Sequence, residues 1–183
     1  IVEQFLSGFH GGDAVGNSVL LFHKFLTARG IESRIVALTI DPELRGQALT
    51  LGEYRENPRA LKIYHFAIAS PLSAYFARCP GKKVLLYHNV TPSRFFAGFS
   101  AQLESLTREA REELKQVKDN CDFFIADSDF NAGELRELDQ VQLAVVWPVL
   151  QTIAPSFIDR KCRPTITSFM PVAVMKMSPS AAA

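Results

Sequence analysis

The sequence lacks the features that mark disulfide-stabilised and zinc-binding proteins. It has three cysteines, Cys79, Cys121 and Cys162, and none of them belongs to a Cys-x-x-Cys pair. An odd and widely spaced set of cysteines is typical of free thiols in a reducing compartment. The four histidines show no paired spacing of the kind that zinc sites use. We therefore expect neither a disulfide framework nor a zinc site.

An excess of charge of one sign is also missing. Lys and Arg number 20 and Asp and Glu number 19, so the formal net charge of the 183 residues is +1. Nucleic-acid binding needs a basic surface, and this balance provides no overall basic field for it. We therefore expect no nucleic-acid partner, although the balance does not exclude a local basic patch.

Long apolar runs and a secretory signal are missing from the pattern as well. The longest uncharged stretches, such as 143–158, are interrupted by Pro148, Pro155 and polar residues, whereas a membrane-spanning helix needs about 20 mostly apolar residues. No basic, apolar and cleavage-site pattern opens the sequence, and Ile1 is typical of a trimmed start inside a strand. We expect a cytoplasmic protein, and peripheral contact with the inner face of a membrane stays open.

Short apolar runs alternate with helical patterns over residues 1–150. The predicted strands cover 1–9, 33–38, 61–66, 83–88, 122–126 and 143–147. The predicted helices lie between Asp13 and Gly30 and over 71–78, 100–120 and 129–138. Because several strands are continuous apolar runs rather than strict alternations, we predict an α/β fold with a mostly parallel sheet and helices on both faces.

The pattern weakens after Pro148. Residues 151–183 contain four prolines and few charges. We therefore predict one domain over residues 1–150 and assign no helix or strand to the tail, 151–183, where Val172–Met175 is the one candidate element.

Parallel α/β sheets bind ligands beyond the carboxyl ends of their strands, and this rule selects four polar segments. The first is a glycine-rich turn after the first predicted strand, with Gly11, Gly12, Asp13 and Asn17. Its glycines allow a phosphate to approach the backbone, and the amino end of the following helix favours an anion. Because the spacing is not Gly-x-Gly-x-x-Gly, no dinucleotide site is predicted, and a plain turn with a helix cap is the alternative.

Two Tyr-His pairs end two further predicted strands. His88 follows a buried run and precedes Asn89 and Thr91. A histidine at this edge can exchange a proton near neutral pH. His65 repeats the pattern at the end of 61–66. The alternatives are that Asn89 and Thr91 only build a turn, that His88 caps a carbonyl and that His65 is a core histidine with satisfied hydrogen bonds.

The last polar segment follows the predicted strand at 122–126. Asp127-Ser128-Asp129 matches the Asp-x-Asp pattern in which carboxylates hold Mg²⁺ or Mn²⁺ on a nucleotide diphosphate. We favour a different function for it, in which Ser128 or Asp129 begins the next helix and no metal binds.

These segments occur in one order along residues 1–150. In sequence they are Gln4-Phe5, Gly12-Asp13-Ala14-Val15-Gly16-Asn17, Tyr64-His65 with Ser70, Tyr87-His88-Asn89-Val90-Thr91-Pro92, Phe95-Phe96, and Ala126-Asp127-Ser128-Asp129-Phe130-Asn131 with Glu134-Leu135. The ordered set resembles the amino-terminal domain of a GT-B glycosyltransferase, in the large retaining group that includes sucrose-synthase-like, mannosyl- and glucosyltransferases. The resemblance implies a Rossmann-like half of a GT-B fold that binds the acceptor and forms one wall of a cleft.

The resemblance also implies a reaction and a set of site residues. The reaction is the transfer of a sugar from a nucleotide sugar to a hydroxyl of a saccharide or lipid-linked acceptor, with retention, and without a metal or a cofactor. The glycine-rich turn would approach the donor diphosphate, and His88 would be the catalytic residue beside the reacting carbon. The residues that the resemblance implies in substrate binding are Gly11, Gly12, Asp13, Asn17, His65, Asn89, Thr91, Ser128 and Asn131.

One departure from the family is large. The second GT-B domain carries a basic residue for the diphosphate and two glutamates eight positions apart, and nothing after Leu150 supplies them. We therefore expect the chain to be inactive, or nearly so, without a C-terminal donor-binding domain. The alternatives are a standalone Rossmann-like module that binds a sugar or a phosphorylated ligand without catalysis and, less favoured, a sugar-nucleotide epimerase.

Overall fold

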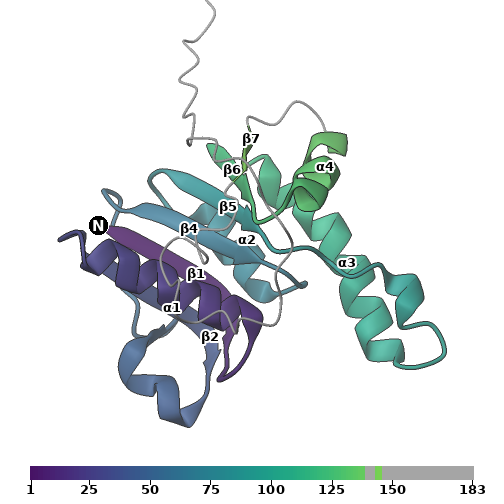
Figure 1. The fold of residues 1–183 in the computed structure, drawn as a ribbon, viewed down its shortest axis with the longest axis horizontal. Coiled ribbons are helices and arrows are strands. Elements are labelled where there is room, and N and C mark those ends of the chain that lie inside the picture. Colours follow the sequence, from purple (N-terminus) through teal and green to yellow (C-terminus); the bar gives the residue numbers. More distant parts are fainter. Residues whose placement is uncertain (139–142, 146–183) are drawn as a thin grey trace, which may run out of the picture.

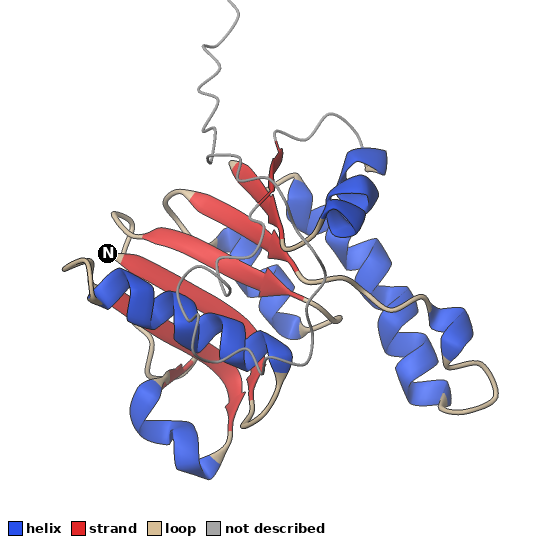
Figure 2. Ribbon diagram, viewed as in Figure 1, coloured by secondary structure: helices blue, strands red, loops and turns tan. Residues whose placement is uncertain are grey.

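A parallel β-sheet forms the centre of the chain in the computed structural model, which describes residues 1–138 and 143–145 (Figures 1 and 2). The strands are β1 (Val2–Phe9), β2 (Ser33–Ile40), β3 (Leu49–Thr50), β4 (Leu61–Phe66), β5 (Lys83–Tyr87), β6 (Phe123–Ala126) and β7 (Leu143–Val145). Their spatial order is β3-β2-β1-β4-β5-β6-β7, and every described strand pair is parallel. The chain thus builds outward from β1 in one direction and then, starting at β4, in the other.

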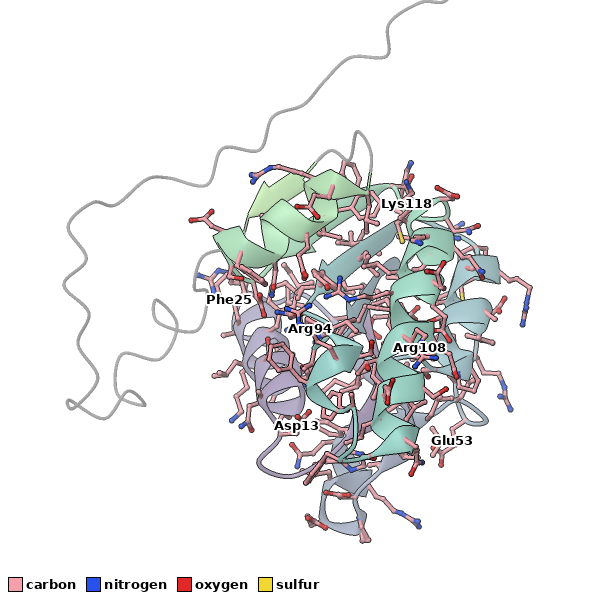
Figure 3. The ribbon with its side chains drawn as sticks, turned by 90° about the vertical axis from the view of Figure 1, so that its right-hand side faces the viewer. Asp13, Phe25, Glu53, Arg94, Arg108 and Lys118 are labelled. Atoms are coloured by element: carbon pink, nitrogen blue, oxygen red, sulfur yellow. The ribbon has the colours of Figure 1, made fainter. Side chains whose placement is uncertain are left out.

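Helices cover the two faces of this sheet. They are α1 (Ala14–Thr27), α2 (Pro71–Arg78), α3 (Ala101–Lys118) and α4 (Asp129–Glu137), with short 3₁₀ turns η1 (Pro42–Gln47) and η2 (Ser93–Phe95). α1 lies on one face, and α2 and α3 lie on the opposite face, as the two perpendicular views show (Figures 1 and 3). α4 packs against β6 and β7. The predicted α/β fold, with a parallel sheet and helices on both faces, is confirmed, and the arrangement is Rossmann-like.

The element boundaries differ from the prediction at a few places. β2 continues to Ile40, and the segment 41–59, which reads as a polar loop with a short helix, also contains the two-residue strand β3. The strand predicted over 83–88 ends at Tyr87, so His88 is the first residue beyond it. The predicted strand end at 146–147, the tail at 151–183 and the candidate element at Val172–Met175 lie outside the described residues.

A short polar side chain begins each of the four helices. Asp13 accepts a hydrogen bond from the backbone N–H of Gly16, which confirms the predicted cap of α1. Ser128 accepts the N–H of Asn131, so Ser128 and not Asp129 is the cap of α4. Ser70 and Ser100 do the same for α2 and α3. Every one of these caps satisfies an N–H that the first helical turn leaves without an intrahelical acceptor.

The residues of each central strand alternate between two hydrophobic cores. Phe5 of β1 and Tyr64 of β4 pack on the α2–α3 side, together with Phe76 of α2. Their neighbours Leu6 and Ile63 pack on the other side, against α1. Because side chains in a strand point alternately to its two faces, His65 shares the α1 face with Ile63. This alternation decides which polar residues can meet at the edge of the sheet.

Two charged residues lie inside the strands, which the apolar pattern did not predict. Glu3 and Lys62 are fully buried, with a carboxylate-to-amino distance of 3.7 Å. The Tyr54 hydroxyl donates to Glu3 Oε2 at 2.6 Å, and Lys62 Nζ donates to the carbonyl of Asn57 at 2.6 Å. Burial and the hydrogen bond to Glu3 raise the pKa of Tyr54, so it stays a donor. This pair lies near the amino ends of β1 and β4, away from the ligand edge, which indicates a structural role.

Gly81 offers a direct test of the connection between α2 and β5. Its φ is +95°, and a Cβ at this position would lie 2.7 Å from the carbonyl oxygen of Pro58. We expect Gly81→Ala to lower the free energy of unfolding, measured by urea denaturation, by about 2 kcal/mol or more. The alanine would have to adopt an unfavourable left-handed φ, and its Cβ would also clash with the backbone of Pro58.

Gly133 provides the matched control. It lies within α4, and a Cβ there meets nothing within 4 Å. Gly133→Ala should stabilise the protein by up to about 1 kcal/mol through helix propensity. Equal midpoints for Gly81→Ala and the unmodified chain would contradict the described connection.

Candidate functional site

Polar segments gather where β1, β4, β5 and β6 end. These four strands are neighbours in the sheet and run parallel, so their carboxyl ends share one edge. The helix that follows β1 and the helix that follows β4 lie on opposite faces (Figure 1). A reversal of this kind opens a crevice beyond the strand ends, which is where open α/β sheets bind ligands. The predicted edge segments therefore lie where a ligand site is expected.

A continuous chain of hydrogen bonds joins three of these segments to Gln4 within β1. Gln4 Oε1 lies 3.1 Å from His65 Nε2, and His65 Nδ1 lies 3.0 Å from His88 Nε2. His88 Nδ1 in turn lies 3.2 Å from Asp127 Oδ2. Asn131 donates its side-chain amide to the other oxygen of Asp127. Side chains from β1, β4, the turn after β5 and the turn after β6 thus form a single network.

The strand register explains why these residues meet. His65 is aligned with Leu86, and Leu86 is aligned with Ile125. His88 and Asp127 follow Leu86 and Ile125 by two positions, so they point to the same face of the sheet as His65. The two imidazole rings are within 15° of parallel, and their centroids are 5.2 Å apart although the facing nitrogen atoms are 3.0 Å apart. The rings therefore meet edge to edge, in the geometry of an N–H···N hydrogen bond.

The members of this network differ in how far their side chains are buried. His65 is 2% exposed, and burial together with the nearby His88 lowers its pKa well below the usual value, so His65 is neutral. The side chain of His88 is 8% exposed and that of Asp127 is 41% exposed. Partial burial of Asp127 opposes its ionisation, but hydrogen bonds from His88 and Asn131 outweigh that effect and lower its pKa. The network thus runs from a buried amide to an ionised carboxylate at the surface.

The tyrosine of each Tyr-His pair points to the opposite face of the sheet and bonds to a helix there. Tyr87 donates its hydroxyl to Glu134 at 2.8 Å and accepts the N–H of Val90 at 3.0 Å. Arg111 donates to the carbonyl of Val90 at 2.8 Å and to Glu134 at 2.9 Å. Tyr64 makes the corresponding contact on β4, at 3.0 Å from the hydroxyl of Ser73. The importance of Arg111, which contacts this turn from the middle of α3, was missed by the sequence reasoning.

The turn that these contacts hold is strained. Asn89 has a φ of +77°, the left-handed region that non-glycine residues rarely adopt, and its Oδ1 is buried without a hydrogen-bond partner. Strain of this kind persists where the surrounding structure enforces it, and it is concentrated at functional sites. The Tyr87, Arg111 and Glu134 network is the structure that enforces it here.

The glycine-rich turn lies at the end of β1 and is tied to β2. Asp41 accepts the N–H of Gly11 at 2.8 Å and the Nδ1–H of His10 at 2.7 Å. These hydrogen bonds, first that from His10, lower the pKa of Asp41. Gly12 has a φ of +78°, as its place in the turn requires. The N–H of Gly11 is therefore occupied, whereas the first-turn N–H groups of α1 at Ala14 and Val15 have no acceptor within the helix.

The predicted site residues occupy three kinds of position. Gly11, Gly12, Asn17 and Thr91 are exposed at the edge. Asp13, His88, Asn89 and Ser128 are half-buried, and Asp13 and Ser128 cap α1 and α4. His65 and Asn131 are buried and lie behind His88 and Asp127, which they contact directly. The structure thus brings the predicted residues to one edge, and whether each contacts a ligand stays a prediction.

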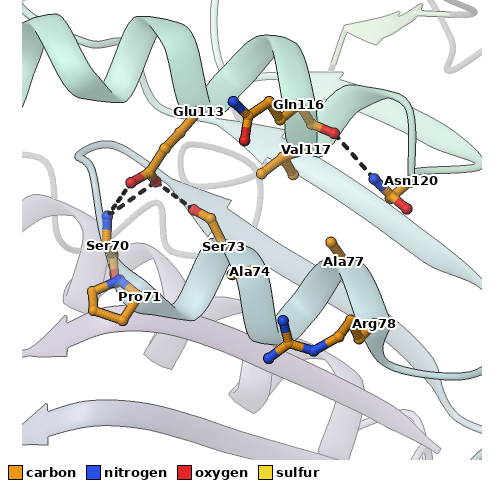
Figure 4. Close-up of a pocket in the computed structure, with 10 residues that line it drawn as sticks. All are labelled: Ser70, Pro71, Ser73, Ala74, Ala77, Arg78, Glu113, Gln116, Val117 and Asn120. Carbon is orange, nitrogen blue, oxygen red and sulfur yellow. Dashed lines mark hydrogen bonds between the residues drawn. The ribbon is translucent and has the colours of Figure 1, made fainter.

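A pocket of about 380 Å³ lies elsewhere, between α2 and α3 (Figure 4). Glu113 lies at one end of the pocket, where it accepts the N–H of Ser70 at 3.0 Å and the hydroxyl of Ser73 at 2.7 Å. This carboxylate holds the N–H of Ser70, the cap residue of α2, and Arg78, Gln116 and Asn120 also line the pocket. The ends of the strands, in contrast, lie at the reversal point of the sheet, where α/β folds bind ligands. The geometry favours the edge of the sheet as the ligand site.

Two further findings concern metals and membranes. Residues 1–138 and 143–145 contain no cluster of three or more His, Cys, Asp or Glu side chains that could hold a metal ion. Within the same residues, no helix has the length and apolar character needed to cross a bilayer.

The fold and the edge network define a Rossmann-like α/β protein with a polar site at the carboxyl end of its sheet. No protein-family model and no curated protein matches the chain. The glycosyltransferase resemblance therefore stays a prediction.

The neutral state of His65 predicts a pH dependence of stability. Because burial lowers its pKa in the folded protein, the unfolded chain binds a proton at His65 before the native state does. The free energy of unfolding should therefore fall as the pH drops below about 6.5, by at most about 1.4 kcal/mol per pH unit from this residue. His65→Asn removes this contribution, so the variant should lose less stability between about pH 7 and pH 5 in urea denaturation. Parallel pH profiles for the two proteins would contradict a neutral, buried His65.

Proposed function

We propose that the chain is the acceptor-binding half of a retaining glycosyltransferase that transfers a sugar from a nucleotide sugar to a hydroxyl acceptor. One observation carries the proposal. Most of the segments that resemble the family motifs lie at one edge of the sheet, where His88 bonds to His65 of β4 and to Asp127 after β6. His65 in turn bonds to Gln4 of β1. In this proposal the nucleotide is bound by a second, C-terminal domain, and the described domain alone is inactive or nearly so.

The chemistry of the edge suits a donor with a diphosphate leaving group. The N–H groups of Ala14 and Val15 at the amino end of α1 have no acceptor within the helix, and Gly12 before them leaves open space for a phosphate. Gly11 is bonded to the carboxylate of Asp41 and contributes no free N–H. Fixed N–H groups and a nearby histidine can stabilise the negative charge that develops on the departing diphosphate. No metal and no cofactor is needed for this step, and the nucleotide sugar is the substrate.

Exposed aromatic rings suit the acceptor. Phe95 and Phe99 follow the His88 turn and are 65% and 84% exposed, and Phe130 follows the cap of α4 and is 69% exposed. Apolar faces of this kind can contact the ring of a saccharide or the chain of a lipid-linked acceptor. We place the protein in the cytoplasm, in peripheral contact with the inner face of the membrane when its acceptor is lipid-linked.

The proposal is tested by replacing His88 in the full enzyme that contains this domain. Transfer from a panel of nucleotide sugars should be measured for the wild type and for His88→Ala, with thermal unfolding to verify the fold. We expect the turnover number to fall about 100-fold, because one fixed group near a developing charge typically contributes that much. His23→Ala, a histidine within α1, is the control and should keep the wild-type rate.

Two outcomes would contradict the proposal. Wild-type turnover of His88→Ala would remove His88 from the catalytic machinery. Saturable binding of a sugar or a phosphorylated ligand by the chain, with no transfer in any combination of donor and acceptor, would support the standalone binding module instead.

A further inference from the structure

We propose that the His65–His88 pair carries one positive charge at neutral pH, centred on His88 and held there by Asp127. The charge itself follows from the hydrogen-bond geometry, and its use in sugar transfer rests on the proposed function. His88 is the member at the ligand edge, and His65 is a positioning residue that acts through it.

A count of protons leads to this conclusion. Three contacts join Gln4, His65, His88 and Asp127 in a line, and each is within hydrogen-bond distance. The line ends on oxygen atoms that accept, so all three protons must come from the four ring nitrogens. Two neutral imidazoles supply only two N–H groups. If both rings were neutral, one contact would place two acceptors face to face, whereas one extra proton satisfies all three.

Both ends of the line are fixed as acceptors. Gln4 directs its amide nitrogen to the carbonyl of Val19 at 3.3 Å and to the hydroxyl of Ser33 at 3.4 Å. Because a carbonyl can only accept, the side-chain oxygen of Gln4 must face His65. At the other end, Asp127 accepts the amide of Asn131 on Oδ1 and faces His88 with Oδ2. Transfer of the proton from His88 to Asp127 would move it from the stronger base, an imidazole, to the weaker base, a carboxylate. The ion pair is therefore the favoured form.

The surroundings place the charge on His88 rather than on His65. His65 is buried between Gln4 and His88, and no carboxylate is bonded to it among the described residues. The ring nitrogens of His88 bond, in the described chain, to His65 of β4 and to Asp127 beyond β6. The charged groups on α3 and α4, Arg111 and Glu134, bond to each other and to Tyr87 and Val90 on the opposite side of the turn.

This arrangement determines what His88 can do. Both of its N–H groups are engaged, one by a neutral ring and one by a carboxylate, so neither is free to pass a proton to a substrate. The line also ends at an amide oxygen, which offers no exit for a proton. His88 would therefore act as a fixed cation rather than as a general acid or base. The His88–Asp127 pair is neutral overall and its carboxylate is the more exposed member, so the imidazolium stabilises negative charge on a leaving group, such as a nucleoside diphosphate, only where that group lies against the ring.

The test is the protonation state of the ring nitrogens. Long-range ¹H–¹⁵N spectra of the 183-residue chain at neutral pH separate N–H nitrogens from bare ring nitrogens. We expect both nitrogens of His88 to be protonated, and His65 to have a protonated Nε2 and a bare Nδ1. A bare nitrogen on His88 in the wild-type chain would overturn the proposal, and this spectrum decides the matter even if no variant folds.

Asp127→Asn tests the cause of the charge. Without the carboxylate, His88 should become neutral, keeping the proton on Nε2 that it donates to His65 and accepting, on Nδ1, the amide that the substitution introduces. Asp129→Asn, two residues away on the first turn of α4, is the matched control and should leave His88 doubly protonated. An unchanged His88 in Asp127→Asn would show that Asp127 does not hold the charge.

Activity of the full enzyme separates this inference from the proposed function. A doubly protonated His88 in the spectrum, with full turnover in His88→Ala, would leave the charge established and the glycosyltransfer role refuted. Loss of turnover in Asp127→Asn to less than a tenth, with Asp129→Asn unaffected and His88 neutral in the variant, would support both.

Discussion

The hydrogen bond between His65 and His88 is the contact on which the edge of the sheet depends. It joins β4 to the first residue beyond β5, and through Gln4 and Asp127 it extends to β1 and to the turn after β6. Inside a protein, a polar group without a partner costs far more than the bond itself contributes, so each member of such a network fixes the next. The positions of the His88 turn and the cap of α4 relative to β1 and β4 follow from this constraint.

In each of the two Tyr-His pairs, the histidine and the tyrosine make their contacts on opposite faces of the sheet. On the α1 face, His65 and His88 meet and reach the ligand edge. On the other face, Tyr64 and Tyr87 bond to Ser73 and Glu134 and so connect the strands to the helices behind them. The strained backbone at Asn89 is therefore held from both sides, which is how a turn with an unfavourable φ can keep a fixed shape at a ligand site.

Much of this fold could be predicted from the sequence, because apolar runs and short polar caps act locally. The strands, the caps Asp13 and Ser128 and the gathering of polar segments at one edge follow from such patterns. Other features depend on contacts between distant residues, which a pattern does not contain. Three such contacts can be found only once the register of the sheet or the position of a helix is known. They are the ion pair of Lys62 with Glu3, the hydrogen bond of Gly11 to Asp41 and the hydrogen bond from Arg111 to the His88 turn.

The central claim is that the carboxyl edge of the sheet is the ligand site, and chemical-shift mapping tests it most directly. Amide spectra of the chain should be recorded with UDP-glucose, GDP-mannose and inorganic diphosphate as separate probes. The account predicts saturable chemical-shift changes in the amide signals of residues 10–13, 88–91 and 127–131. The nucleotide sugars and diphosphate should shift signals at this same edge. Shifts confined to the pocket between α2 and α3 would contradict it.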